Sequence, residues 1–182
     1  MYADAFIHHL TTHPEYKQQI VHIQHVPPRE PKFGALERPL HPSLEARLKA
    51  LGISSLYSHQ AQAINAARNG KNIMVATASA SGKTLCYNLA VLQSLLEGRP
   101  ACALYLFPTK ALAQDQLRSL RELACPELVG YTECATFDGD TPLAERREIK
   151  KRAKIVLTNP DMLHVGILPN HGSWSRLFRN LK

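Results

Sequence analysis

Residues 72–84 read NIMVATASASGKT and join a short apolar run to a loop of small residues. The run from Asn72 to Ala76 is bounded by turn-forming residues, a pattern typical of a buried strand. Beyond the loop, leucines recur along one helix face until Gly98 and Pro100 end the pattern; these are Leu85, Leu89, Leu92 and Leu96. The stretch therefore predicts a strand, a loop and a helix in direct succession.

The same alternation continues along the chain. Further strands are expected at 101–107, 132–137 and 155–157, each followed by a helix, at 111–124, at 141–152 and from Pro160. Before the quoted stretch, helices are expected at 43–51 and from Ser58 to Asn69. Strands that alternate with helices indicate an α/β fold, with a parallel sheet flanked by helices on both faces.

Residues 1–42 differ from the rest in composition. They are rich in proline and histidine and end in VPPREPKFGALERPLHP, in which each proline removes a backbone donor. We expect an extended arm over 1–42, with one short helix that His13-Pro14 stops. The α/β domain is expected over 43–182.

The composition narrows the class of protein. The chain has 182 residues, 45% of them apolar, and a formal net charge of +7. A chain of this length can bury one hydrophobic core, which indicates one domain. The excess of basic over acidic residues favours a polyanionic partner. The apolar runs are far shorter than the roughly 20 residues of a membrane span, and the first residues lack the pattern of a secretory signal. The four cysteines form no C-x-x-C pair, so we expect reduced thiols and a cytoplasmic protein without a membrane partner.

The loop ASASGKT at 78–84 has the chemistry of a phosphate site. Its small residues let successive backbone amides point at phosphate oxygens, Gly82 permits close approach, and the following helix adds its positive N-terminal end. Lys83 can then reach the β and γ phosphates, and the Thr84 hydroxyl can bind Mg²⁺. The usual pattern has glycine where this chain has Thr77, so a chance SGKT on a solvated loop is the alternative.

Five segments in order resemble the motifs of the DEAD/DEAH-box superfamily of helicases. They are LYSHQAQAI at 56–64 (Q motif), ATASASGKT at 76–84 (motif I), FPTKALAQDQL at 107–117 (motif Ia), FDGDT at 137–141, and LTNPDML at 157–163 (motif Ib). Their wording is most similar to the bacterial relatives of RecQ-like repair helicases, whose full-length members carry a C-terminal zinc-binding region. The resemblance implies a RecA-like P-loop domain in an ATP-dependent DNA helicase that acts in DNA repair.

The resemblance also assigns roles to residues. Gln60 would read the adenine edge of ATP, and Lys83 and Thr84 would be catalytic, with Thr84 on Mg²⁺. The expected partner is single-stranded or partly duplex DNA, with RNA left open. The ATP-binding set is Gln60, Thr77, Ser79, Ala80, Ser81, Gly82, Lys83 and Thr84, and the nucleic-acid-binding set is Pro108, Thr109, Lys110, Gly139, Thr158 and Asn159.

Several residues in or beside these motifs have a plainer interpretation. Lys110 by itself is a solvated charge, and Asp138 and Asp140 are turn and cap residues rather than ligands. Thr158 and Asn159 also fit ordinary turn chemistry before a proline. The basic stripe on the helix after FDGDT is interpreted as a solvated face; it consists of Arg146, Lys150 and Lys154.

The chain contains no Asp-Glu dipeptide. In the family that it resembles, a DEAH-type motif follows motif Ib closely, and a second motor domain follows the first. We therefore expect the N-terminal part of a first motor domain, truncated before the DEAH-box strand and nearly inactive by itself. A non-catalytic nucleic-acid-binding fragment is one alternative. A P-loop small-molecule kinase is another, although it leaves motifs Ia and Ib unexplained.

Overall fold

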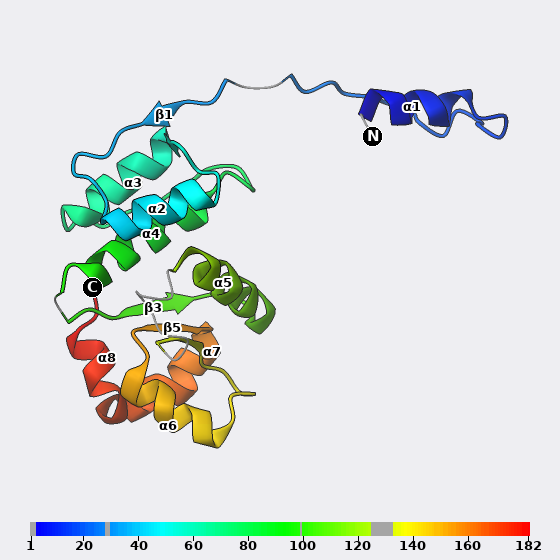
Figure 1. The fold of residues 1–182 in the computed structure, drawn as a ribbon. Coiled ribbons are helices and arrows are strands. Elements are labelled where there is room, and N and C mark those ends of the chain that lie inside the picture. The colour runs from blue at the N-terminus through cyan, green and yellow to red at the C-terminus, as the bar shows by residue number, and fades with distance from the viewer. Residues whose placement is uncertain (1–2, 28–29, 99, 125–132) are drawn as a thin grey trace. The chain divides into compact units, whose positions relative to one another are not determined.

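The structure, a computed structural model, describes residues 3–27, 30–98, 100–124 and 133–182. Its contacts divide the chain into two compact units, Met1–Pro31 and Lys32–Lys182. In the first unit, helix α1 (Ala3–Thr12) is the short helix expected before His13-Pro14, and none of its ten residues is buried (Figure 1). The division expected between an arm and a domain at residue 42 stays a prediction.

Three parallel strands form the sheet of the second unit. Their order across the sheet is β3 (Ala103–Leu106), β5 (Ile155–Thr158) and β4 (Cys134–Thr136). Ala103 and Cys134 lie on either side of Ile155 in the register. Every residue of the central strand β5 is buried, as expected of a parallel strand that is covered on both faces. The parallel sheet predicted from the alternating pattern is thus confirmed.

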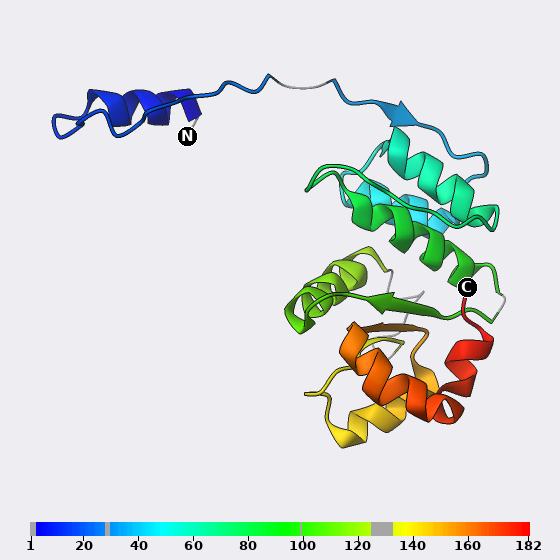
Figure 2. The same ribbon diagram turned by 180° about the vertical axis from the view of Figure 1, so that it is seen from behind.

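Side chains alternate between two hydrophobic cores. Ala103, Tyr105, Ile155 and Leu157 face the core under α2 (Pro42–Ala50), α3 (Ser58–Arg68), α4 (Lys83–Leu96) and α5 (Lys110–Leu123). Val156 and Leu104 face the second core, which includes residues of α6 (Leu143–Arg152) and α8 (Ser175–Arg179). Figures 1 and 2 show these helices on opposite sides of the sheet.

The expected helices form close to their predicted bounds. Helix α3 begins at Ser58, with Tyr57 rather than Ser58 as its N-cap. Helix α6 begins after Pro142, which is its N-cap rather than its first-turn residue. Helix α7 (Pro160–Met162) starts where Pro160 predicts and continues into a π-helical turn and a 3-10 segment that ends at Trp174.

Two further pairings complete the second unit. The short strands β1 (Phe33–Gly34) and β2 (Leu56–Tyr57) are antiparallel. Leu181 forms a parallel bridge with Cys102, at the edge of β3 that faces away from β5.

The strand predicted at 72–76 does not form, and that prediction is wrong for this structure. Ile73 is 43% exposed and Met74 is 92% exposed. An apolar run becomes a strand only where a neighbour completes its backbone hydrogen bonds, and no strand of the described residues pairs with this segment. Two other predictions concern residues outside the described ranges. They are the reduced thiol of Cys125 and the start of the strand expected at 132–137, Thr132.

Within the described ranges, no helix is long and apolar enough to cross a membrane.

Candidate nucleotide and nucleic-acid sites

The candidate phosphate loop, residues 77–84, leads directly into helix α4. Gly82 is the N-cap of this helix and has a left-handed backbone, with φ +76°. A Cβ atom at this position would lie 2.5 Å from Nε2 of Gln60. Ala80 is also left-handed, with φ +58°. The structure therefore requires glycine at 82 for two reasons, its backbone conformation and the close approach of Gln60.

The first turn of α3 holds the loop from the side. Gln60 is 2% exposed; its Oε1 accepts the backbone N–H of Tyr57 at 2.9 Å, and its Nε2 donates to the Gly82 carbonyl at 3.0 Å. Nε2 of His59 lies 3.0 Å from the Ser81 carbonyl oxygen and must carry a proton to donate there, because a carbonyl only accepts. The side chains of His59 and Gln60 thus contact the backbone carbonyls of two successive loop residues, Ser81 and Gly82.

These contacts alter the interpretation of the Q motif segment. Both ends of the Gln60 amide are engaged with backbone groups, which leaves one Nε2 hydrogen and one Oε1 lone pair for its predicted contact with adenine. His59 was not among the predicted site residues. Its position directly before Gln60 was the only sequence signal for it.

Lys83 folds back over its own loop. Its Nζ donates to the carbonyl oxygens of Thr77 at 2.9 Å and Ala78 at 2.6 Å. The hydroxyl of Thr77, the residue that replaces the usual glycine, lies 2.6 Å from Oγ of Ser81. The cation predicted to meet phosphates is therefore held by carbonyl oxygens of the loop.

A polar link connects the phosphate helix α4 with α5. Oε1 of Gln116 accepts the hydroxyl of Tyr87 at 2.8 Å and that of Thr84 at 3.4 Å. Burial raises the pKa of Tyr87, so its hydroxyl stays a donor at neutral pH. The hydroxyl of Tyr105 on β3 likewise donates to Asn88 on α4 at 3.0 Å. Gln116 lies inside the segment that resembles motif Ia, but no role was predicted for it.

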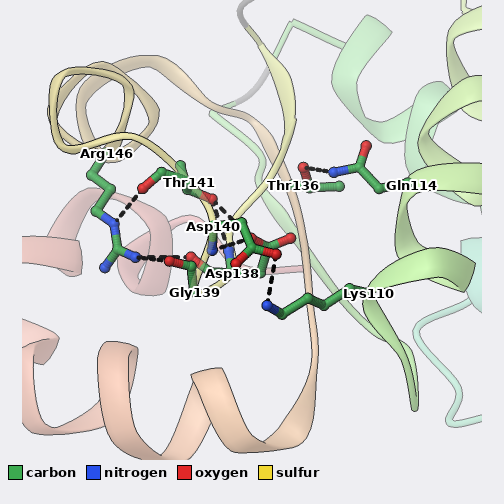
Figure 3. A network of polar contacts seen from close by, with 8 residues as sticks. All are labelled: Lys110, Gln114, Thr136, Asp138, Gly139, Asp140, Thr141 and Arg146. Atoms are coloured by element: carbon green, nitrogen blue, oxygen red, sulfur yellow. Dashed lines mark hydrogen bonds and ion pairs between the residues drawn. The ribbon is translucent and has the colours of Figure 1, made fainter.

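The start of α5 lies at the carboxyl end of β3. Thr109 is the N-cap, and its hydroxyl accepts the N–H of Leu112 at 3.2 Å. Lys110 follows as the first helical residue, with its Nζ 2.8 Å from Oδ2 of Asp140 (Figure 3). This hydrogen bond raises the pKa of Lys110. Pro108, Thr109 and Lys110 are all exposed, as their predicted role requires.

The FDGDT segment is a tight turn between β4 and α6. Oδ1 of Asp138 accepts the N–H of Asp140 at 2.9 Å, and the N–H of Asp138 donates to the Thr141 hydroxyl at 2.9 Å (Figure 3). These contacts confirm Asp138 as a turn residue. A Cβ atom on Gly139 would lie 3.5 Å from Nζ of Lys110, so the two residues are neighbours. The start of α5 (108–110) and the DGDT turn (138–141) are together called the candidate nucleic-acid edge.

Arg146 braces this turn, which corrects the interpretation of the basic stripe as a solvated face. Its guanidinium donates to the carbonyls of Asp138 at 2.9 Å, Gly139 at 3.2 Å and Thr141 at 2.9 Å. It also lies 5.2 Å from the Phe137 ring centroid. The other two members of the stripe also have partners. Nζ of Lys150 lies 5.6 Å from the Trp174 ring, and Nζ of Lys154 lies 3.0 Å from Glu133.

Thr158 and Asn159 make internal contacts. Thr158 is 1% exposed, and its hydroxyl donates to the Phe137 carbonyl at 2.6 Å. Oδ1 of Asn159 caps α7 by accepting the N–H of Met162 at 2.7 Å. The turn interpretation thus accounts for Asn159, whereas Thr158 ends strand β5 and bonds to the residue that follows β4. The Thr158 hydroxyl is buried and bonded within the chain, so it is not exposed for the predicted contact with a nucleic-acid strand.

The sequence profile of the DEAD/DEAH box helicases matches residues 57–182. The chain belongs to this helicase family. Over 165 residues it is 47% identical to the uncharacterized ATP-dependent helicase YprA of Bacillus subtilis, covering 91% of this chain and 22% of YprA. It is 43% identical to the ATP-dependent helicase hrq1 of Schizosaccharomyces pombe, covering 98% of this chain and 17% of hrq1.

Solved helicase structures have the same fold. A crystal structure of the helicase MrfA bound to DNA and AMPPNP superposes with a TM-score of 0.80 at 47% identity, over 86% of this chain and 22% of MrfA. A DEAD box protein from Methanococcus jannaschii matches with a TM-score of 0.61 at 21% identity, over 75% of this chain and 37% of that protein. The RecA-like fold of this DEAD/DEAH box chain is therefore confirmed. The chain spans about a fifth of the length of YprA, hrq1 and MrfA.

Proposed function

We propose that this chain is the part of an ATP-dependent DNA helicase that binds ATP and contacts single-stranded DNA. One observation carries the proposal. Helix α5 starts at the exposed edge with Lys110 and, further along, reaches the phosphate helix α4 through Gln116. The same rigid element thus touches both candidate sites. YprA and hrq1 are named ATP-dependent helicases, and MrfA has been crystallised with DNA and AMPPNP, which supports this function.

The loop residues fit a triphosphate. The left-handed Gly82 and Ala80 lie at the N-terminus of the 14-residue helix α4, where backbone N–H groups favour an anion. Lys83 would exchange the carbonyls of Thr77 and Ala78 for phosphate oxygens. Thr84 would bind Mg²⁺, whose other ligands would come from phosphate oxygens and water. When bound, ATP supplies the phosphoryl group whose hydrolysis powers the proposed enzyme.

The full predicted sets are kept as proposals with two changes, at Gln60 and at Thr158. Thr77, Ser79, Ala80, Ser81 and the residues up to Thr84 would hold the phosphates, while Gln60 would act on the loop as well as on adenine. On the nucleic-acid side, Pro108, Thr109, Lys110, Gly139 and Asn159 would lie along the strand. Thr158 would position Phe137 and the turn after it, because its hydroxyl is buried.

A second motor domain, a role in DNA repair and a cytoplasmic location are part of the proposal for the whole protein. Membership in a helicase family argues against the small-molecule kinase alternative. A non-catalytic nucleic-acid-binding fragment remains the second candidate. Its support is that, in the described residues, no carboxylate hydrogen-bonds to Lys83 or Thr84.

Separate binding assays on the 182-residue chain test the proposal. Lys83→Ala should weaken binding of a fluorescent ATP analogue about tenfold or more and leave oligo-dT binding unchanged, because a side-chain partner of the phosphates is lost. Lys110→Ala should weaken oligo-dT binding and leave nucleotide binding unchanged. Lys71→Ala and Lys151→Ala, at exposed lysines, are the controls for net charge.

Three outcomes would overturn this assignment. One is nucleotide binding that is insensitive to Lys83→Ala. Another is loss of both activities in each variant although circular dichroism shows folded protein. If oligo-dT binds and the ATP analogue does not, the non-catalytic fragment is the correct function.

A further inference from the structure

We propose that Asp140 is an internal competitor of nucleic acid: its carboxylate occupies Lys110 until a strand phosphate displaces it. This inference rests on the proposed function, since it names how the edge that includes Lys110 is regulated. Neither the family profile nor the similarity to other helicases assigns a role to Asp140.

The ion pair lies where a phosphate is expected. Lys110 Nζ and Asp140 Oδ2 are 2.8 Å apart, and the side chains are 46% and 80% exposed. The pair joins the N-terminal residue of the 14-residue helix α5 to the turn before α6. The anionic carboxylate of Asp140 thus contacts the lysine that begins α5, as a strand phosphate would. Both partners remain accessible to a competing anion.

The DGDT turn is held by contacts that do not involve the Asp140 carboxylate. The backbone N–H of Asp140 donates to Asp138, and Arg146 holds the carbonyls of the three other residues of the DGDT turn (Figure 3). Within the described residues, the Asp140 carboxylate has Lys110 as its only hydrogen-bond and ion-pair partner. Displacement therefore needs a change of one side-chain rotamer and leaves the turn intact.

Gly139 leaves one side of Lys110 open. A Cβ atom at this position would lie 3.5 Å from the Lys110 nitrogen, in contact with it. Without that atom, the nitrogen stays within reach of a phosphate oxygen that approaches over the turn. The lysine is thus exposed to solvent on one side and paired with Asp140 on another.

This arrangement has a measurable consequence for salt dependence. A free lysine that binds a phosphate makes the nucleic acid release a counterion, which steepens the dependence of affinity on salt. A lysine already paired with Asp140 exchanges one anion for another and leaves a carboxylate near the strand. The native chain should therefore bind oligo-dT more weakly, and with a shallower salt slope, than a chain in which residue 140 is neutral.

The test compares oligo-dT affinity over a range of salt for the unchanged chain, Asp140→Asn, Lys110→Ala and the double variant. Asp140→Asn keeps the side-chain shape and removes the charge. It should raise affinity about three- to tenfold at low salt and steepen the log–log slope by about 0.7. In the Lys110→Ala background the same change should have less than a twofold effect. Asp115→Asn, an exposed acid on α5, is the control for net charge.

The possible results separate this inference from the proposed function. If Lys110→Ala leaves oligo-dT binding unchanged, the nucleic-acid edge itself is misplaced. If Lys110→Ala weakens binding but Asp140→Asn also weakens it, Asp140 holds Lys110 in its binding position and the competition is refuted. The competition is also refuted if Asp140→Asn raises oligo-dT affinity no more than Asp115→Asn does, or if it raises affinity equally in the Lys110→Ala background. The gain in affinity would then come from the change in net charge alone. Thermal unfolding of each variant confirms that it is folded.

Discussion

The phosphate loop and the DGDT turn are supported in different ways. The loop follows a segment that is exposed and lacks a partner strand in the described ranges, and it is held by its own side chains and by α3. The turn follows the sheet strand β4, and Arg146 braces its carbonyls. The comparison indicates that the DGDT turn, at the candidate nucleic-acid edge, is supported by the sheet, whereas the candidate phosphate loop is supported by a few side-chain contacts.

The largest difference in stability is expected between substitutions in strand β5 and in residues 72–76. Leu157→Ala removes a fully buried side chain of the central strand and should lower the free energy of unfolding by about 2–5 kcal/mol. Met74→Ala, at a side chain that is 92% exposed, should change it by less than about 0.5 kcal/mol. Urea unfolding followed by circular dichroism measures both. A similar large loss for both variants would mean that residues 72–76 are a buried strand after all.

Two glycines with similar backbones sharpen the account of the loop. Gly82 and Gly98 have φ +76° and +73°, but only at Gly82 would a Cβ meet another side chain. Gly98→Ala should cost about 1 kcal/mol from the left-handed backbone alone and leave nucleotide affinity unchanged. Gly82→Ala should cost about 2–3 kcal/mol, because the contact with Gln60 adds to the same strain.

Nucleotide titration with a fluorescent ATP analogue completes this test. Gly82→Ala should lower affinity about tenfold, because both the backbone and the Gln60 contact that shape the loop are disturbed. Equal affinities for the two glycine variants would refute a specific role for the approach of Gln60.

A smaller effect than that of Leu157→Ala or Gly82→Ala is expected at the DGDT turn. Arg146→Ala removes donors to three carbonyls and should lower stability by about 1–2 kcal/mol. Hydrogen exchange at Asp138–Thr141 should become faster, since the turn loses its brace. Arg147→Ala, at an exposed neighbour on the same helix, is the control and should change neither quantity. Unchanged exchange in Arg146→Ala would show that the turn does not need the brace.

The sequence predicted β3 and β5 well because they are continuous apolar runs, and α4 and α5 well because their leucines recur at helical spacing. The apolar run at 72–76 was wrongly predicted to be a strand. An apolar run indicates a tendency to form a strand, but it does not show whether a neighbouring strand is present to pair with it. The spacing of the basic stripe could not separate a solvated face from a brace, because Arg146 folds back onto the turn before its own helix.

The roles of Gln60, Lys83 and Lys110 stay predictions. The motifs named these three residues but not the groups that contact them in the structure. Their partners are Gly82, Thr77 and Asp140, and only Thr77 and Gly82 belonged to the predicted set. Asp140 was interpreted as a turn residue because its contact with Lys110, 30 positions away, depends on the order of the strands.

The central claim is that the loop from Thr77 to Thr84 holds the triphosphate, apart from the edge that includes Lys110. Amide chemical shifts of the ¹⁵N-labelled chain, recorded on addition of Mg-AMPPNP and separately of oligo-dT, test it most directly. The account predicts that AMPPNP shifts the amides of 77–84 and spares Gly139 and Asp140, while oligo-dT does the reverse. AMPPNP shifts confined to residues outside 77–84 would contradict it.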